Sequence, residues 1–289
     1  MARSWAFIQK HSVLTYFVLT IGLSWGTVLL LTGELGPMYG ADWRSDPKFM
    51  LGVLGGPVFA AAVGILMTWL ISGREGLRDL RTRLLRWRVG MRWYALALLL
   101  APLSTIGVAV LLDLSLSSPE FLPAIFTTSD PVGLLLPGLV AGLFVGCSEE
   151  VGWTGFVIPR LRLRYGVLAT GLIVGIPWGA WHFPLFRESG SFSELLLLIL
   201  LLVKLFAWLP AYRVLMVRVY DHTNSLSVAM LMHASASATS VILATSGLSV
   251  TQSLTSLLVW AALLWAIVAA VAVASRRQPS RHPLSRSAA

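Results

Sequence analysis

Eight long apolar segments, separated by short polar connections, dominate this sequence and restrict it to a fold built in lipid. A transmembrane helix needs about 20 predominantly apolar residues to cross the bilayer core. The composition agrees, because 56% of the residues are hydrophobic and 12% are charged, whereas soluble domains have about 25% charged residues. We therefore predict an all-α polytopic membrane bundle of about eight transmembrane helices. The predicted spans are 12–33, 49–72, 92–112, 132–151, 166–186, 192–212, 225–246 and 253–275.

Positive charges gather in alternate connections, and this alternation predicts which ends of the spans face the cytoplasm. Cytoplasmic connections carry an excess of lysine and arginine. We therefore expect a multi-pass protein of the cell (inner or plasma) membrane with both termini in the cytoplasm. The basic residues behind this prediction are Arg3 and Lys10 before the first span, Arg74, Arg78, Arg81, Arg83, Arg86, Arg88 and Arg92 in the second connection, Arg160, Arg162 and Arg164 in the fourth, Arg213 and Arg218 in the sixth, and Arg276, Arg277, Arg281 and Arg286 in the tail.

The chain is expected to form one transmembrane bundle over residues 1–275, without a soluble domain. Residues 276–289 are rich in serine, arginine and proline, which predicts a disordered cytoplasmic tail. Residues 76–87 place leucines three and four apart with arginines on the other face. This pattern predicts an amphipathic helix in the cytoplasmic interface, held by anionic headgroups or docking a substrate. The net charge of +9 does not indicate a nucleic acid partner, because the arginines lie between spans; the expected surroundings are the lipid bilayer.

Two adjacent carboxylates, Glu149 and Glu150, lie in an otherwise apolar segment. Ionisable groups at membrane depth cost several kcal/mol and mark functional sites by default. Neighbours on a helix point about 100° apart, so the two glutamates must have different roles. Thr154 lies one turn after Glu150 and shares its face. Close helix packing or a bend is favoured by glycines at 142, 146, 152 and 155.

Two histidines in later apolar segments complete the candidate set. His182 has Trp178 one turn before it, in a segment with nearby prolines, and His233 has Ser237 one turn after it, among small residues. Each histidine alone has a structural alternative, a hydrogen bond to a backbone carbonyl, and a lone glutamate can serve packing. Two glutamates and two histidines from three helices are the composition of a hydrolytic or a metal centre.

Peptide hydrolysis needs an activated water, a group that holds the developing oxyanion, and a proton donor for the leaving amine. A buried carboxylate can act as the base, and histidine can orient the water or stabilise negative charge. Glu149, His182 and His233 also have the composition of a catalytic zinc site with an open fourth position. The sequence therefore leaves open both a site with Zn²⁺ and a metal-free mechanism.

These residues resemble the motifs of a known family. Residues 149–156, which read EEVGWTGF, followed by Pro159, Arg160 and Leu161, are similar to the first motif of the CAAX protease and bacteriocin-processing (CPBP, also called Abi) intramembrane proteases. The segment from Trp178 to His182 resembles the second motif, and residues 224–237, centred on His233, resemble the third. The resemblance covers about 130–250.

The resemblance implies an eight-helix bundle with a cavity in the membrane, and an endopeptidase that acts on a membrane-associated or lipophilic peptide. By motif position, Glu149 and His182 would activate the water and Glu150 would support the site. His233 would stabilise the oxyanion. Trp178, Thr154 and Ser237 are the expected supporting residues.

Two positions depart from the family pattern. The first motif has arginine where this chain has Thr154, so Glu150 is expected to lack an ion pair and to hold a proton more readily. The third motif ends in asparagine or aspartate where this chain has Ser237, whose hydroxyl is shorter, and the loss of one oxyanion donor costs about 100- to 1000-fold in rate. A weakened or inactive member that serves as a membrane scaffold or immunity factor is therefore an alternative. An ion-coupled carrier is a third function, against which the lack of an internal repeat argues.

The depths of the candidate residues present a difficulty. Counted along straight helices at about 1.5 Å per residue, Glu149 and His233 fall in the inner half of the membrane and His182 falls nearer the outer face. Kinks at Gly152 and Pro177, or a late start of the fifth span, are expected to bring them level.

Overall fold

The structure, a computed structural model, describes residues 7–35, 46–116, 120–188 and 190–276. Within these ranges the regular structure is helical and contains no strand. Six helices in the described part of the chain are long and apolar enough to cross a membrane, and two shorter apolar helices, Val167–Trp181 and Leu226–Ile242, accompany them. The predicted all-α polytopic bundle is therefore confirmed. Arg3 and the predicted tail beyond Arg276 lie outside the described residues.

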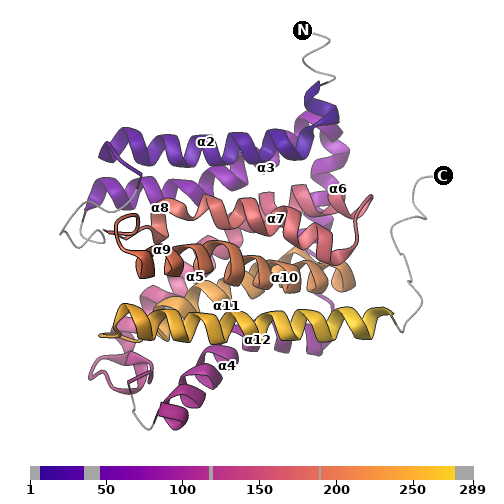
Figure 1. The fold of residues 1–289 in the computed structure, drawn as a ribbon. Coiled ribbons are helices and arrows are strands. Elements are labelled where there is room, and N and C mark those ends of the chain that lie inside the picture. The colour runs from indigo at the N-terminus through magenta and orange to yellow at the C-terminus, as the bar shows by residue number, and fades with distance from the viewer. Residues whose placement is uncertain (1–6, 36–45, 117–119, 189, 277–289) are drawn as a thin grey trace.

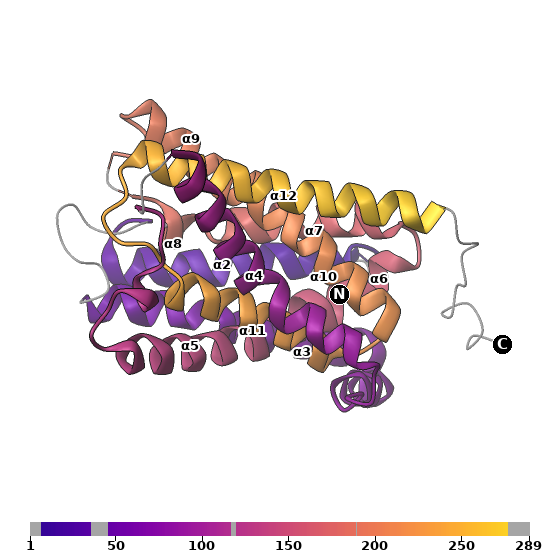
Figure 2. The same cartoon turned by 90° about the horizontal axis from the view of Figure 1, so that it is seen from below.

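The long helices lie side by side in one bundle (Figure 1), and α4 crosses α11 obliquely (Figure 2). The start of α2 and the end of α12 lie at the same end of the bundle, as the prediction for the termini requires; the side of the membrane stays a prediction. The elements are α2 (Ser12–Thr32), α3 (Pro47–Leu84), α4 (Met91–Leu116), η2 (Ala124–Phe126), α5 (Pro131–Gly152), η3 (Trp153–Val157), α6 (Ile158–Arg162), α7 (Val167–Trp181), α8 (Phe183–Phe186), α9 (Leu195–Val203), η4 (Lys204–Trp208), α10 (Leu209–Thr223), α11 (Leu226–Ile242) and α12 (Val250–Arg276).

Glycines bring α5 and α11 into close contact. A Cβ atom on Gly142 would lie 2.5 Å from the carbonyl oxygen of Ala234, and one on Gly146 would lie 2.5 Å from that of Met230. Because no side chain fits between the two backbones, the helices can approach each other as small residues allow in membrane bundles. This contact sets the residues that follow Gly146 beside the middle of α11.

Two helices continue past the ends that the sequence predicted for them. The helix that contains α5 passes through a π-helical turn, η3, into α6, so one helix runs over Pro131–Arg162 instead of 132–151. The helix that contains α9 likewise passes through η4 into α10 and runs over Leu195–Thr223 instead of 192–212. The sequence indicated that both spans end at nearby arginines, which were assigned to the membrane interface. The residues of η3 and most residues of α10 are instead buried in protein, so both helices continue farther.

The amphipathic segment is the last part of α3. Gly73 adopts φ 57°, ψ −149°, a backbone conformation that only glycine adopts without strain, and thereby separates this segment from the spanning part of the helix. The helix then continues to Leu84, three residues short of its predicted end. Arg83 is buried and donates to the Gly155 carbonyl at 2.9 Å and to the Tyr220 hydroxyl at 2.8 Å. The segment is therefore fixed to η3 and α10 by protein contacts, and its place at the lipid interface stays a prediction.

Gly152 should be intolerant of any side chain. A Cβ atom there would overlap the Tyr16 hydroxyl and the Ala60 carbonyl, and Gly64 of α3 already lies against the Gly152 backbone. We expect Gly152→Ala to lower the free energy of unfolding by about 1–3 kcal/mol, the usual cost of overpacking. Thermal unfolding in detergent measures this change. The control is Gly107→Ala on α4, where a Cβ would meet nothing within 4 Å; equal melting temperatures for the two variants would contradict the close packing described here.

Candidate active site

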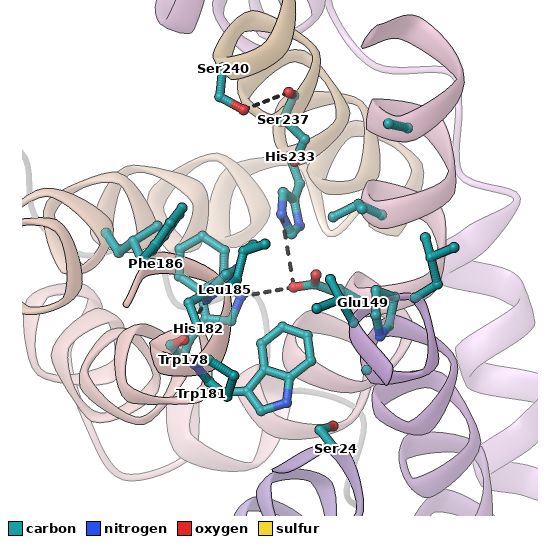
Figure 3. A pocket seen from close by; sticks show the side chains of 18 of the residues that line it. Ser24, Glu149, Trp178, Trp181, His182, Leu185, Phe186, His233, Ser237 and Ser240 are labelled. Atoms are coloured by element: carbon teal, nitrogen blue, oxygen red, sulfur yellow. Dashed lines mark hydrogen bonds and ion pairs between the residues drawn. The ribbon is translucent and has the colours of Figure 1, made fainter. Parts of the chain in front are cut away.

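Glu149 lies at the centre of the site, near the end of α5. Its side chain is buried, and its Oε2 accepts a hydrogen bond of 2.9 Å from Nε1 of Trp178 on α7. The Nε2 atom of His233, on α11, lies 3.9 Å from the same oxygen (Figure 3). Three helices thus bring one carboxylate, one indole and one imidazole together, as the sequence predicted for these residues.

Glu150 lies behind this group and is completely buried. Nη1 of Arg213 donates to its Oε1 at 2.9 Å and to its Oε2 at 2.8 Å. Nδ1 of His233 lies 2.7 Å from Oε1, and the Thr154 hydroxyl donates to Oε2. His233 therefore faces Glu150 with one ring nitrogen and Glu149 with the other, which gives the two neighbouring glutamates different surroundings and different roles.

The expectation that Glu150 lacks an ion pair is wrong. Arg213 supplies the guanidinium from a different helix, and the short side chain of Thr154 adds a hydroxyl donor. The sequence placed Arg213 in a cytoplasmic connection, whereas it lies inside α10 and is completely buried. Its signal was its position within residues 205–217, where it is the one charged residue, because a charged residue inside an apolar membrane helix is functional by default.

His182 follows the last residue of α7 and turns its ring towards the site. Its Nδ1 lies 2.7 Å from the Trp178 carbonyl oxygen, so Nδ1 carries the hydrogen and Nε2 is the acceptor of the neutral ring. The ring stacks on Phe186 at 5.5 Å between centroids and meets the Trp178 and Trp181 rings edge to face. The bond to a backbone carbonyl was the structural alternative for a lone histidine, and here it orients a ring that also faces a cavity.

The longer fourth span resolves the difficulty with depth. Glu149 lies about thirteen residues before the helix ends at Arg162, and His182 lies about fifteen residues after α7 begins at Val167. At about 1.5 Å per residue, both residues lie about 20 Å along their helices from the connection between Arg162 and Val167. A kink is not needed to make them level, because the helix that contains α5 continues to Arg162, eleven residues past its predicted end.

A cavity of about 330 Å³ joins these side chains. Glu149, His182, His233 and Ser237 line it together with Trp178. In Figure 3 the side chains of Trp178 and His233 point towards Glu149, and Ser237 lies farther along α11 beside Ser240. A water molecule has a share of about 30 Å³ in the liquid, so the cavity has room for a water and a short stretch of peptide. Glu150, Thr154 and Arg213 do not line it. The remaining wall is largely apolar and includes Trp25, Trp181, Phe186 and Trp208.

The predicted zinc ligands do not form a coordination group in their present arrangement. Within the described residues, no three histidine, cysteine, aspartate or glutamate side chains are arranged to hold a metal ion. Oε2 of Glu149 accepts a hydrogen bond from Trp178, whereas the contacts of His233 and His182 to Glu150 and to a carbonyl use Nδ1 and leave Nε2 of both rings free. Zn²⁺ bound by Glu149, His182 and His233 stays an untested prediction.

Comparison with known proteins agrees with the resemblance in the motifs. Residues 131–239 match the family model described as "Type II CAAX prenyl endopeptidase Rce1-like". The chain is also similar to a protein named CAAX prenyl protease 2 from Methanococcus maripaludis, with 27% identity over 150 residues. The match covers 50% of this chain and 54% of that protein, so the chain spans about half the length of the curated relative. The residues matched by the family model contain Glu149, Glu150, Thr154, Trp178, His182, Arg213, His233 and Ser237, whereas Trp25 of the cavity wall lies outside them.

Proposed function

We propose that this member of the CPBP family of intramembrane proteases is an endopeptidase that hydrolyses a peptide bond in a membrane-associated or lipophilic peptide. One observation supports this most strongly: Glu149, His182 and His233 line one cavity that is otherwise largely apolar. A polar reacting group inside an apolar wall suits a substrate that arrives from the lipid. The aromatic side chains of the wall favour apolar residues next to the bond that is cleaved.

In the proposed reaction, a water in the cavity donates one hydrogen bond to Glu149 and one to Nε2 of His182. Glu149 takes a proton from the water as the water oxygen bonds to the carbonyl carbon of the substrate. The carbonyl oxygen becomes negatively charged. The groups assigned to stabilise it are the Ser237 hydroxyl and His233, which line the same cavity. His233 serves in its doubly protonated form, in which Nδ1–H donates to Glu150 and Nε2–H to the oxyanion. When the C–N bond breaks, the proton held by Glu149 passes to the leaving amine.

His182→Ala tests this assignment against a closely matched control. We expect kcat for a membrane-inserted peptide to fall about 100-fold or more, because the water loses one of the two groups that orient it. New peptide termini, measured by mass spectrometry after incubation in liposomes, report the rate. The control is His222→Ala, since His222 also lies within hydrogen-bond distance of the carbonyl four residues earlier but is exposed and does not line the cavity. Equal losses in both variants, or none in His182→Ala, would overturn the role of His182.

We propose that water activation at this site is metal-free, which the lack of a three-ligand group among the histidine, cysteine, aspartate and glutamate side chains of the described residues supports. Prolonged treatment with a strong zinc chelator, followed by its removal, should leave kcat unchanged. A loss of activity that added Zn²⁺ restores would contradict this and would assign Glu149, His182 and His233 as ligands.

A further inference from the structure

We propose that Arg213 is a positioning residue of this site, which fixes the orientation of both glutamates without touching the substrate. The proposal rests on the proposed hydrolysis, because it states how the base and its neighbours are held. Arg213 lies on α10, whereas both glutamates lie on α5, so it couples two helices that are distant in sequence.

The first contact of Arg213 holds Glu150. Its Nη1 atom reaches both carboxylate oxygens, and Oε1 of Glu150 is also paired with Nδ1 of His233. Fixing Glu150 therefore fixes the ring of His233. The Nε2 atom of that ring lies 3.9 Å from Oε2 of Glu149. Through Glu150, Arg213 therefore sets the position of His233, the residue assigned to the oxyanion.

The second contact of Arg213 holds Trp178. The guanidinium carbon lies over the Trp178 ring, 3.9 Å from its centre, which is a cation–π contact. The Nε1–H group of that indole is the donor that orients Glu149. Through Trp178, Arg213 therefore sets the position of Glu149, the proposed base.

The remaining polar atoms of Arg213 argue for this double role. Its Nε and Nη2 atoms are buried and have no hydrogen-bond partner among the described residues. A guanidinium buried only to stabilise the fold would be expected to have its donors satisfied. Among the described residues, the guanidinium donates hydrogen bonds to the Glu150 carboxylate and makes its cation–π contact with Trp178.

Replacing Arg213 by lysine separates its contact with Glu150 from its contact with Trp178. An ammonium group can reach Glu150 as a point charge, but it lacks the planar face that stacks on an indole. We expect Arg213→Lys to fold and to lower kcat about 100-fold with little change in KM, as for a base displaced by about 1 Å. Arg162→Met is the matched control, because Arg162 pairs with Asp221 outside the cavity, and it should retain the kcat of the unaltered protein.

A double variant tests whether the contact of Arg213 with Trp178 acts independently of Glu150. Arg213→Met alone leaves the Glu150 carboxylate buried without its partner and can fail to fold. Arg213→Met combined with Glu150→Gln removes both charges, and its kcat should lie about 100-fold below the kcat of Glu150→Gln alone, because the contact with Trp178 is lost as well. A double variant as active as Glu150→Gln alone, or an unchanged kcat in Arg213→Lys, would overturn the proposal.

A spectroscopic measurement separates this proposal from the proposed function. The indole N–H resonance of Trp178, assigned by its loss in Trp178→Phe, should move in Arg213→Lys and in Glu149→Gln, but not in Arg162→Met. If the unaltered protein hydrolyses no peptide, the proposed function fails, and this resonance still decides the role of Arg213. A Trp178 resonance unmoved by Arg213→Lys would show that Arg213 does not position the indole.

Discussion

Replacing Glu149 by glutamine is expected to lower kcat by about 100- to 10,000-fold, the range attributed to general acid–base catalysis, with little change in thermal stability. The amide cannot accept a proton from water at neutral pH. Its oxygen can still accept the hydrogen bond from Nε1 of Trp178 that the carboxylate accepts now, so the packing of the site remains. Turnover of a membrane-inserted peptide and thermal unfolding of the same samples give both quantities.

The control for this prediction is Glu75→Gln, which changes the charge in the same way at an exposed position on α3. It should leave kcat unaltered. An active Glu149→Gln variant would remove the proposed base from the mechanism, and a variant that unfolds would assign Glu149 to structure.

An arginine at position 154, where the family pattern has one, is expected to damage this protein. Thr154 is completely buried, and Glu150 already pairs with Arg213. Thr154→Arg would place two guanidinium groups beside one carboxylate and would also overpack η3. An unpaired buried charge costs about 3–5 kcal/mol, so we expect a large fall in melting temperature and the loss of activity.

Two further variants separate charge from volume in that prediction. Thr154→Val keeps the shape and removes the hydroxyl donor to Glu150, and should cost about 1 kcal/mol. Thr154→Arg combined with Arg213→Leu restores one guanidinium per carboxylate and should recover part of the stability. A single Thr154→Arg variant that is more stable or more active than the unaltered protein would contradict the arrangement around Glu150.

The contact between Arg213 and Glu150 also bears on the alternative of an inactive scaffold. One motive for that alternative was the missing arginine at position 154, and a guanidinium reaches the same carboxylate from α10. Ser237 remains the other departure, and it lines the cavity one turn from His233. A lower rate from a weaker oxyanion donor remains compatible with hydrolysis.

The sequence predicted the parts of the site that have a local signature. Glu149 and Glu150 stand out because carboxylates are rare in apolar segments, and His182 and His233 were recognised in the same way. Their convergence was predicted from composition and from the family motifs, and the structure brings them to one place. Local sequence contains this information because the cost of burying an ionisable group is a property of the residue and its immediate surroundings.

The sequence did not predict the role of Arg213 or the continuation of the helix that contains α5 through η3 and α6. Three arginines at 160, 162 and 164 were assigned to the membrane interface, although the residues of η3 just before them are completely buried. Whether a basic helix end meets lipid or protein depends on which other helices cover it. The same holds for Arg213, whose partners Glu150 and Trp178 come from two distant segments. A π-helical turn such as η3 likewise depends on tertiary contacts, here the hydrogen bond from Arg83 to the Gly155 carbonyl.

Hydrolysis in water labelled with heavy oxygen tests the central claim most directly. The protein in liposomes is given a membrane-inserted peptide library, and the new carboxyl termini are analysed by mass spectrometry. The account predicts one heavy oxygen atom in each new carboxylate with the unaltered protein, and almost no new termini with Glu149→Gln. Absence of cleavage by the unaltered protein, or equal cleavage by both proteins, would contradict it.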